Sequence, residues 1–497
     1  MVFSKNIRRA LHKLQICWTI KMDRIKAFIN GRFQNSDGEV LIKINPVSGA
    51  PIAEVEKTDT ALLEHAITAA KNAQIEWSSL TGQERGHIMM RAARMLESSL
   101  EELTRLEVRD VGKAWSEAIS ADVPCGAEAY EYFGSLAATL TGTSHKWSGA
   151  RGFTERVPLG ICAGIGAWNY PTQIACWKSA PALAMGNAFI LKPSEMTPYT
   201  ANAIAEILQE AGLPAGLFQV VHGDFSVGRA LCEHPDIAKI SLTGGVETGK
   251  KILAQSASTL KKVTLELGGK APLIVFADAD FDVAVQTALD ANFYTAGEVC
   301  SNATRVFVDE KILDKFVEAM RDKTQALKIG DPMKEETQIG ALISEHHLEK
   351  VLSYISIGKS EGAHLVTGGE RQFPDGCEGG FFISPAIFTD CKDDMRIVKE
   401  EIFGPVMAVL SFKGEEEVIE RANNTPFGLG AGIMTSDLSR AHRVADKLDA
   451  GNIWINSYNL IPPDWPFGGV KQSGFGRESS VFALESYSQV KATYIQY

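Results

Sequence analysis

The run Gly160-Ile-Cys-Ala-Gly-Ile-Gly-Ala167 contains only apolar and small residues, and Trp168-Asn169-Tyr170-Pro171 follows it directly. A short apolar run without polar alternation is typical of a strand that is buried on both faces. Similar runs alternate with helical patterns as far as residue 267. The other expected strands are 188–191, 217–221, 237–242 and 263–267, and the expected helices are 178–185, 198–211 and 247–257. This alternation predicts an α/β fold with a doubly wound parallel sheet, whose ligands collect at the carboxyl ends of the strands.

The flanking segments extend this pattern. A second α/β unit is expected after Gly269, with strands 273–276 and 304–308 and helices 281–292 and 311–327. Before residue 140 we expect strands between 40 and 55, a helix capped by Thr58 or Asp59, and a helical region over 83–106. Residues 140–155 are expected to form a protruding hairpin, and residues 487–497 alternate like a terminal strand. Because neither has an obvious core of its own, we expect both to pair with another subunit.

Length and composition narrow the class of protein. The chain has 497 residues, which favours two or three domains. Its hydrophobic fraction is 45%, its charged fraction 22% and its net charge −11. An acidic balance gives no footprint for nucleic acid and disfavours anionic membranes, and we find no run of about 18 apolar residues that would span a membrane.

The cysteines and the first 21 residues bear on location. None of the eight cysteines forms a C-x-x-C pair, which indicates neither a zinc site nor a redox dithiol. Sparse cysteine in a long chain fits reduced thiols in the cytoplasm. Residues 1–21 are basic and free of acidic residues, as in a mitochondrial presequence. We favour an unneeded upstream extension, because Ser4 is the only serine in this segment.

The stretch Phe293-Tyr-Thr-Ala-Gly-Glu-Val-Cys-Ser301 carries the candidate nucleophile, Cys300. A thiolate attacks carbonyl carbons, and the small residues around Cys300 leave space for a substrate. The alternative is a plain buried cysteine. Asn169 offers a side-chain amide that would stabilise an oxyanion together with the backbone N–H of Cys300, although an Asn before Tyr-Pro is also a common turn residue. Glu266 ends an apolar strand, where burial favours a general base; alternatively it pairs with a backbone N–H or with Lys270.

Two further stretches indicate nucleotide binding. Lys192 and Glu195 at a strand end suit ribose hydroxyls, and the carboxylate would repel a 2′-phosphate, which favours NAD over NADP. The alternative is a surface ion pair. Gly244-Gly-Val-Glu-Thr-Gly-Lys250 opens a helix after a strand, and helix N-termini bind phosphate. The stretch nearly matches a P-loop, but residue 251 is lysine rather than the serine or threonine that holds magnesium. The G-x-G-x-x-G fingerprint is absent.

Two other local patterns are interpreted as structural. Gly358-Lys-Ser-Glu-Gly362 matches G-x-S-x-G, but it follows a helical run rather than a strand, so we interpret it as a helix C-terminal turn. His346-His347 lacks metal-ligand spacing and is expected at the surface, and no metal site is predicted.

As a set, the motifs closely resemble the NAD-dependent aldehyde dehydrogenase superfamily, from about Lys26 to the C-terminus. The stretches that carry the resemblance are Trp168-Asn-Tyr-Pro171, Lys192-Pro-Ser-Glu195, Thr243-Gly-Gly245, Glu266-Leu-Gly-Gly-Lys270, Gly297-x-x-Cys300, Glu400-Glu-Ile-Phe-Gly-Pro405 and Pro466-Phe-Gly-Gly-x-Lys471-x-Ser473-Gly474. The likeness is strongest to betaine aldehyde and trimethylaminobutyraldehyde dehydrogenases, through residues 165–171 and 177–184.

The resemblance implies the roles of the site residues. Cys300 would be the nucleophile, Glu266 the base for hydrolytic water and Asn169 the oxyanion ligand; we also count Lys192 as catalytic. The cofactor-binding residues would be Trp168, Lys192, Glu195, Gly244, Gly245, Gly249, Leu267, Glu401 and Phe403. The substrate-binding residues would be Tyr170, Trp177, Tyr294, Trp465 and Phe467. Glu298 stands where the family commonly has Gln, and we expect its carboxylate to raise the pKa of Cys300.

The resemblance also implies two doubly wound α/β domains and a small β oligomerisation element. The NAD-binding domain would comprise 22–139 and 157–266, the catalytic domain 267–477, and the oligomerisation element 140–156 and 478–497. The basic extension 1–21 lies outside the family pattern. The expected reaction oxidises a small-molecule aldehyde, in particular betaine aldehyde to glycine betaine, through a Cys300 thiohemiacetal and thioester, in a homo-oligomer (dimer or tetramer). The alternatives are a general aliphatic or amino-aldehyde dehydrogenase, a P-loop-like nucleotide-binding protein, or a non-catalytic structural protein of this fold.

Overall fold

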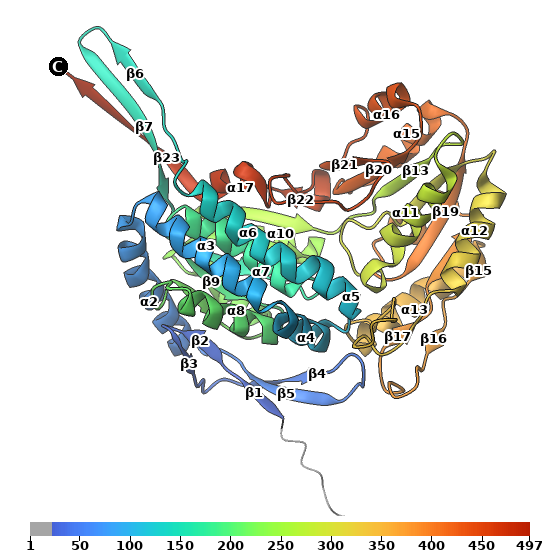
Figure 1. The fold of residues 1–497 in the computed structure, drawn as a ribbon, viewed down its shortest axis with the longest axis horizontal. Helices are drawn as coiled ribbons and strands as arrows, with labels where there is room; N and C mark the ends of the chain where they lie inside the picture. The colour runs from blue at the N-terminus through green and yellow to red at the C-terminus, as the bar shows by residue number, and fades with distance from the viewer. Residues whose placement is uncertain (1–21) are drawn as a thin grey trace, which may run out of the picture.

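The computed structural model describes residues 22–497, and the interpretation of residues 1–21 lies outside this range. Two large sheets, each covered by helices, form the body of the molecule, and a three-stranded arm projects from it (Figure 1). No helix within 22–497 is long and apolar enough to cross a membrane.

The first sheet has the order β22-β12-β11-β8-β9-β10-β2-β3. Its strands are β2 Ala27–Ile29, β3 Arg32–Gln34, β8 Ile161–Ile165, β9 Ala188–Lys192, β10 Phe218–Val220, β11 Ile237–Gly244, β12 Lys262–Leu267 and β22 Gly474–Phe475. The central strands β10, β9, β8, β11 and β12 are parallel, which confirms the predicted parallel sheet. The edge strands β2, β3 and β22 pair antiparallel.

Helices and turns surround the first sheet. They are α2 Thr60–Ser79, α3 Gly82–Ser98, α4 Leu100–Val111, α5 Trp115–Glu117, the π-helix η1 Ala118–Asp122, α6 Val123–Leu136, α7 Pro171–Ala184, α8 Tyr199–Glu210, α9 Phe225–Glu233, α10 Val246–Ser256 and the 3₁₀ turn η2 Ala257–Thr259. Three of the helices, α2, α3 and α9, begin at a side-chain cap. The Asp59 side chain accepts from the Leu62 N–H, and Thr81 with Glu84 forms a capping box. The region expected as one helix over 83–106 is two helices, divided at Ser99.

The second sheet has the order β15-β18-β19-β14-β13-β20-β21, and all its strands except β15 are parallel. Its strands are β13 Pro272–Val275, β14 Arg305–Asp309, β15 His364–Thr367, β18 Ala386–Thr389, β19 Val406–Phe412, β20 Gly430–Met434 and β21 Asn452–Ile455. The helices and turns are α11 Phe281–Phe293, η3 Tyr294–Gly297, α12 Leu313–Gln325, α13 Glu345–Ser360, α14 Arg396–Lys399, α15 Glu415–Asn423, α16 Leu438–Ala445 and η4 Lys471–Ser473. Helix α13 ends at the G-x-S-x-G stretch, as predicted.

Three small sheets complete the fold. They are β1 Asp23–Ile25 with β5 Pro51–Glu56 and β4 Val40–Ile44; β16 Arg371–Gln372 with β17 Phe382–Ile383; and the arm of β6 Ser144–Trp147, β7 Ala150–Pro158 and β23 Ser488–Gln496. Helix α17 Ser480–Ser486 precedes β23. The hairpin was predicted, but the pairing of the terminal strand was not. β23 lies antiparallel along β7 of its own chain, because one long edge of the hairpin is free to accept it.

The connection from β12 to β13 joins the two sheets and places the predicted site between them. Residues 268–271 form this link, and each sheet has its own hydrophobic core. The carboxyl ends of β8, β11 and β12 therefore face the turn that follows α11.

Candidate active site

Cys300 lies at the end of a strained turn. Thr295, Ala296 and Gly297 have φ values of 50°, 48° and 77°, three consecutive residues in the left-handed region. For non-glycine residues this conformation costs on the order of 1–3 kcal/mol each and persists only where the surroundings determine it. A Cβ at Gly297 would lie 2.3 Å from the carbonyl carbon of Gly404, so only glycine fits there.

An aromatic-walled cavity surrounds the Cys300 thiol, which is partly exposed to it. The cavity is partly open to solvent and has a volume of about 160 Å³. Its lining includes Cys125, Asn169, Tyr170, Gln173, Trp177, Lys178, Glu266, Tyr294, Cys300, Ser301, Asn459, Ile461, Phe467 and Glu478. Four of the five predicted substrate residues are therefore in the cavity. The fifth, Trp465, is 50% exposed and does not line the cavity, so its role in substrate binding stays a prediction.

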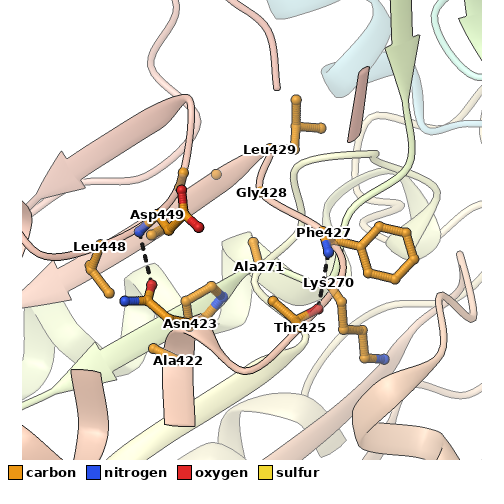
Figure 2. Close-up of a pocket in the computed structure, with 14 residues that line it drawn as sticks. Lys270, Ala271, Ala422, Asn423, Thr425, Phe427, Gly428, Leu429, Leu448 and Asp449 are labelled. Atoms are coloured by element: carbon orange, nitrogen blue, oxygen red, sulfur yellow. Dashed lines mark hydrogen bonds between the residues drawn. The ribbon is translucent and has the colours of Figure 1, made fainter. Parts of the chain in front are cut away.

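A second pocket lies beside the start of β20 and contains none of the predicted site residues (Figure 2). Two hydrogen bonds join its loops: the Asp449 N–H donates to Asn423 Oδ1 at 2.8 Å, and the Phe427 N–H donates to Thr425 Oγ1 at 3.3 Å. The backbone N–H groups of Asp449 and Phe427 are thus paired with side chains of the pocket itself, and we assign no catalytic role to this pocket.

Asn169 follows β8 and is 4% exposed. Its Nδ2 donates to the backbone carbonyl of Glu298 at 2.9 Å, which fixes the amide against the Cys300 turn. An amide nitrogen carries two hydrogens, so one N–H remains for a ligand in the cavity. The arrangement suits an oxyanion formed beside Cys300.

Glu266 lies at the end of β12, 5% exposed, and neither of its carboxyl oxygens has a hydrogen-bond partner among residues 22–497. Burial, and next the nearby Glu478 carboxylate, raise the pKa of Glu266 well above its usual range. Burial also raises the pKa of Cys300 to about 12, with Glu266 and Glu401 adding to the shift. The Lys270 ammonium has no partner either, so the alternative pairing of Glu266 with Lys270 is not observed.

A buried ion pair next to Glu266 was not predicted. Lys178 Nζ lies 2.5 Å from Glu478 Oε1 and 3.0 Å from Ser241 Oγ. Both charged side chains line the cavity, and the second Glu478 oxygen has no partner in the described part of the chain. The two residues are 300 positions apart, so sequence spacing carries no signal for their contact.

Residues predicted to bind a dinucleotide gather at the carboxyl ends of β9 and β11. Lys192 Nζ donates to the Pro193 carbonyl at 2.9 Å and lies 3.6 Å from the half-exposed Glu195 carboxylate. Gly245 caps α10 without a side-chain hydrogen bond, and a Cβ at Gly245 would meet nothing within 4 Å, so the first N–H groups of the helix are open to a phosphate. Lys192 does not line the cavity around Cys300, and its assignment as catalytic stays a prediction.

Contacts also explain the glycines at this edge of the first sheet. A Cβ at Gly249 would lie 2.8 Å from the Leu267 side chain. A Cβ at Gly268 would overlap the Glu401 carboxylate, whose Oε1 accepts from the Gly269 N–H at 3.0 Å. The open helix end, the Lys192–Glu195 pair and the cradle around Glu401 together fit a dinucleotide.

His347 and Glu298 differ from the predictions. His347 is buried rather than at the surface; its Nε2 lies 2.7 Å from the Phe403 carbonyl, and its ring packs on Trp168. Glu298 Oε1 accepts from the Ile343 N–H at 3.1 Å. Burial raises the pKa of Glu298 well above its usual range, which favours the neutral carboxyl group. The expectation that it raises the pKa of Cys300 was wrong, because its carboxyl faces Ile343 and His347.

Glu117 supports the Cys300 turn and was also not predicted. Its Oε1 accepts from the Thr295 N–H at 2.7 Å, and its other oxygen has no partner among residues 22–497. Thr295 Oγ1 lies 2.7 Å from the Tyr170 hydroxyl, so the same turn holds a wall of the cavity. Burial raises the pKa of Glu117 to about 7.

Comparisons with known proteins agree with this geometry. Residues 33–493 match the model of the aldehyde dehydrogenase family. A betaine aldehyde dehydrogenase of Rhizobium etli is 53% identical over 94% of this chain and 96% of its own length, and one of Sinorhizobium fredii is 53% identical with the same coverage. The structure of an NAD+ complex of an aldehyde dehydrogenase from Bacillus cereus superposes with a TM-score of 0.93 and 41% identity, covering 95% of this chain and 97% of that one. The chain belongs to the aldehyde dehydrogenase family.

Proposed function

We propose that this chain oxidises betaine aldehyde to glycine betaine with NAD. The observation that carries the proposal is the convergence of Cys300, Asn169 and Glu266 on one cavity whose walls include four aromatic side chains. The identity to betaine aldehyde dehydrogenases supports the substrate. The runner-up is a general aliphatic or amino-aldehyde dehydrogenase.

The chain's own residues account for the covalent steps. The Cys300 thiol releases its proton to water, and the Sγ thiolate adds to the aldehyde carbon. The π electrons of the carbonyl move to its oxygen, and this oxyanion accepts from the free Asn169 N–H and the Cys300 backbone N–H. NAD, when bound, supplies the hydride acceptor that converts the thiohemiacetal into a thioester. Glu266 then takes a proton from water, which attacks the thioester carbon and releases the acid and the Cys300 thiol. The buried Lys178–Glu478 pair is positioned to influence the protonation of Glu266.

The proposed cofactor contacts follow from the residues that gather at the carboxyl ends of β9 and β11. Lys192 and Glu195 would hold the adenosine ribose, the N terminus of α10 the pyrophosphate, and Glu401 with Phe403 and Trp168 the nicotinamide side. The proposed cofactor site also includes Gly244, Gly245, Gly249 and Leu267.

Tyr170, Trp177, Tyr294 and Phe467 are proposed as the substrate cage. The Trp177 and Phe467 ring centroids are 5.7 Å apart, with a 58° tilt between the planes. A quaternary ammonium gains about 0.5–2 kcal/mol from each aromatic face and needs no hydrogen bond. Cys125 and Ile461 add further apolar lining.

A matched pair of aldehydes tests the cage. Betaine aldehyde and its neutral isostere 3,3-dimethylbutanal have nearly the same shape, so only a cage distinguishes them by charge. We expect kcat/KM to favour betaine aldehyde by at least about tenfold, because 1.4 kcal/mol is one decade. Trp177→Ala should reduce this ratio more than it reduces turnover of the isostere. Equal turnover of the two aldehydes by the wild type would favour the general dehydrogenase instead.

Assembly, location and domain roles are part of the proposal. The arm exposes Trp147, Phe153, Val490, Tyr494 and Ile495. Such a surface supports a homo-oligomer in which arms meet other subunits. We place the enzyme in the cytoplasm. Residues 22–139 and 157–266 would form the NAD-binding domain and 267–477 the catalytic domain, with β22 of the latter range completing the first sheet.

A further inference from the structure

Phe403 adopts a backbone conformation that needs an external cause. Its φ is 63°, in the left-handed region that a bulky residue rarely adopts. Its ring packs edge-on against Trp168, with centroids 5.2 Å apart and planes at 89°. Neither ring is fully buried, so the pair forms an accessible aromatic wall beside β8.

His347 is the hydrogen-bond partner of the Phe403 carbonyl. The imidazole comes from the first turn of α13, and its Nε2 lies 2.7 Å from that oxygen. Burial lowers the pKa of His347 to about 4, so the ring is neutral and carries one N–H. Because a carbonyl only accepts, this hydrogen is on Nε2.

The same imidazole nitrogen, Nε2, also lies near the catalytic turn. Glu298 Oε1 lies 3.5 Å from His347 Nε2. The backbone carbonyl of Glu298 accepts from Asn169 Nδ2, and Asn169 is the chain neighbour of Trp168. The His347 ring also packs on Trp168, with centroids 5.4 Å apart. The contacts therefore close a ring that joins the oxyanion amide to the aromatic wall.

We propose that His347 is a positioning residue that holds Phe403 in its left-handed conformation and so aligns the cofactor-side aromatic wall with the oxyanion amide. Its Nε2–H donates to the Phe403 carbonyl and its ring supports Trp168, so the two aromatic residues keep one relative orientation. The inference rests on the proposed function, because the partner of this wall is NAD.

Equilibrium binding of NAD to the cofactor-free enzyme tests the inference without turnover. His347→Ala removes the donor, and we expect the Kd for NAD, measured by isothermal titration calorimetry, to rise at least about tenfold. His347→Gln keeps an N–H donor on a side chain of similar reach and should bind NAD within about threefold of wild type. In steady state, His347→Ala should raise the KM for NAD more than it lowers kcat. The exposed neighbour provides the control, since His346→Ala should bind as the wild type does.

Separate outcomes distinguish this inference from the proposed function. If the wild type does not bind NAD, the proposed function fails. If the wild type binds NAD and His347→Ala binds it equally well, His347 does not position the wall. Equal loss in His347→Gln and His347→Ala would show that ring shape rather than the hydrogen bond matters, which also overturns the inference. If His347→Ala does not fold, His347→Asn takes its place in the comparison with His347→Gln, because the Asn amide is too short to reach the Phe403 carbonyl. Alkylation of Cys300 by iodoacetamide should proceed at the wild-type rate in each folded variant.

Discussion

Replacement of Glu117 separates the stability of the Cys300 turn from its chemistry. In the folded protein the pKa of Glu117 is raised to about 7 from an ordinary 4.5, with burial as the main cause. The folded state therefore binds more protons than the unfolded state between these values, so stability falls as pH rises from 4.5 to 7 and stays low above 7. A difference of about 2.5 pKa units corresponds to about 3 kcal/mol.

Glu117→Gln removes this loss but keeps an oxygen that can accept from the Thr295 N–H. We expect the variant to match the wild type near pH 5 and to be more stable by about 3 kcal/mol at pH 8.5. For a chain of this length the unfolding entropy is on the order of 1 kcal/mol/K, so Tm should rise by about 3 °C at the higher pH. Relative to Glu117→Gln, Glu117→Ala leaves a buried N–H without a partner, which costs about 1–3 kcal/mol at both pH values.

Differential scanning calorimetry of the three proteins at pH 5 and pH 8.5 measures these shifts. Steady-state kinetics adds the functional arm: Glu117→Ala should lower kcat/KM by about tenfold because the Thr295 turn loosens, a loss that corresponds to about 1.4 kcal/mol. Glu117→Gln should stay within a few-fold of the wild type. The reasoning is refuted if Glu117→Gln gains no stability between pH 5 and pH 8.5 relative to wild type.

The remaining predictions address the nucleophile, the base, the cofactor and the assembly. Cys300→Ala should abolish NADH formation while NAD still binds by calorimetry; substantial residual dehydrogenase activity would contradict the assignment. Glu266→Gln should slow hydrolysis of the thioester, seen as a burst of NADH followed by slow turnover, and turnover within a few-fold of wild type at neutral pH would count against a base at this position. Glu195 should make NAD a better substrate than NADP in kcat/KM, and equal use of both would show that its carboxylate does not oppose the extra phosphate. Deletion of 487–497 removes β23 and leaves one edge of β7 without a partner strand, which should shift the mass measured by light scattering toward the monomer; an unchanged oligomer would show that the arm is not part of the interface.

The sequence predicts the first sheet because local patterns determine it. The run that becomes β8 is apolar along its whole length and the run that becomes β9 is apolar up to Lys192, as is typical of strands buried on both faces. Helix α9 was missed because it has only nine residues and carries Gly228, which weakens its helical pattern. Helix α7 begins seven residues earlier than predicted, at Pro171. Proline at the first helical position is a start signal, and the motif around it was interpreted only as a loop.

Part of the candidate site could be predicted because local sequence patterns also mark some of its residues. Cys300, Asn169 and Glu266 each lie in a distinctive local stretch, and the structure brings all three to one cavity. Glu117, His347 and Glu478 were missed or misplaced because their partners are distant in sequence: Glu117 meets Thr295 across 178 positions, and Lys178 meets Glu478 across 300. Only packing of the two sheets creates these contacts, so no local pattern reports them.

Three carboxyl groups surround the catalytic turn, and their protonation determines what the cavity recognises. Burial raises the pKa of Glu266 and Glu298 well above the usual range and that of Glu117 to about 7. Each upward shift favours the neutral carboxyl group over the carboxylate, which weakens the attraction of these groups for a cation. Attraction for a cationic substrate must then come mainly from the faces of rings such as Trp177 and Tyr294, which act at any pH. A neutral Glu266 next to Cys300 also keeps like charges apart until the thiol has reacted. The base is released for hydrolysis only when it ionises, which places its activation after formation of the covalent intermediate.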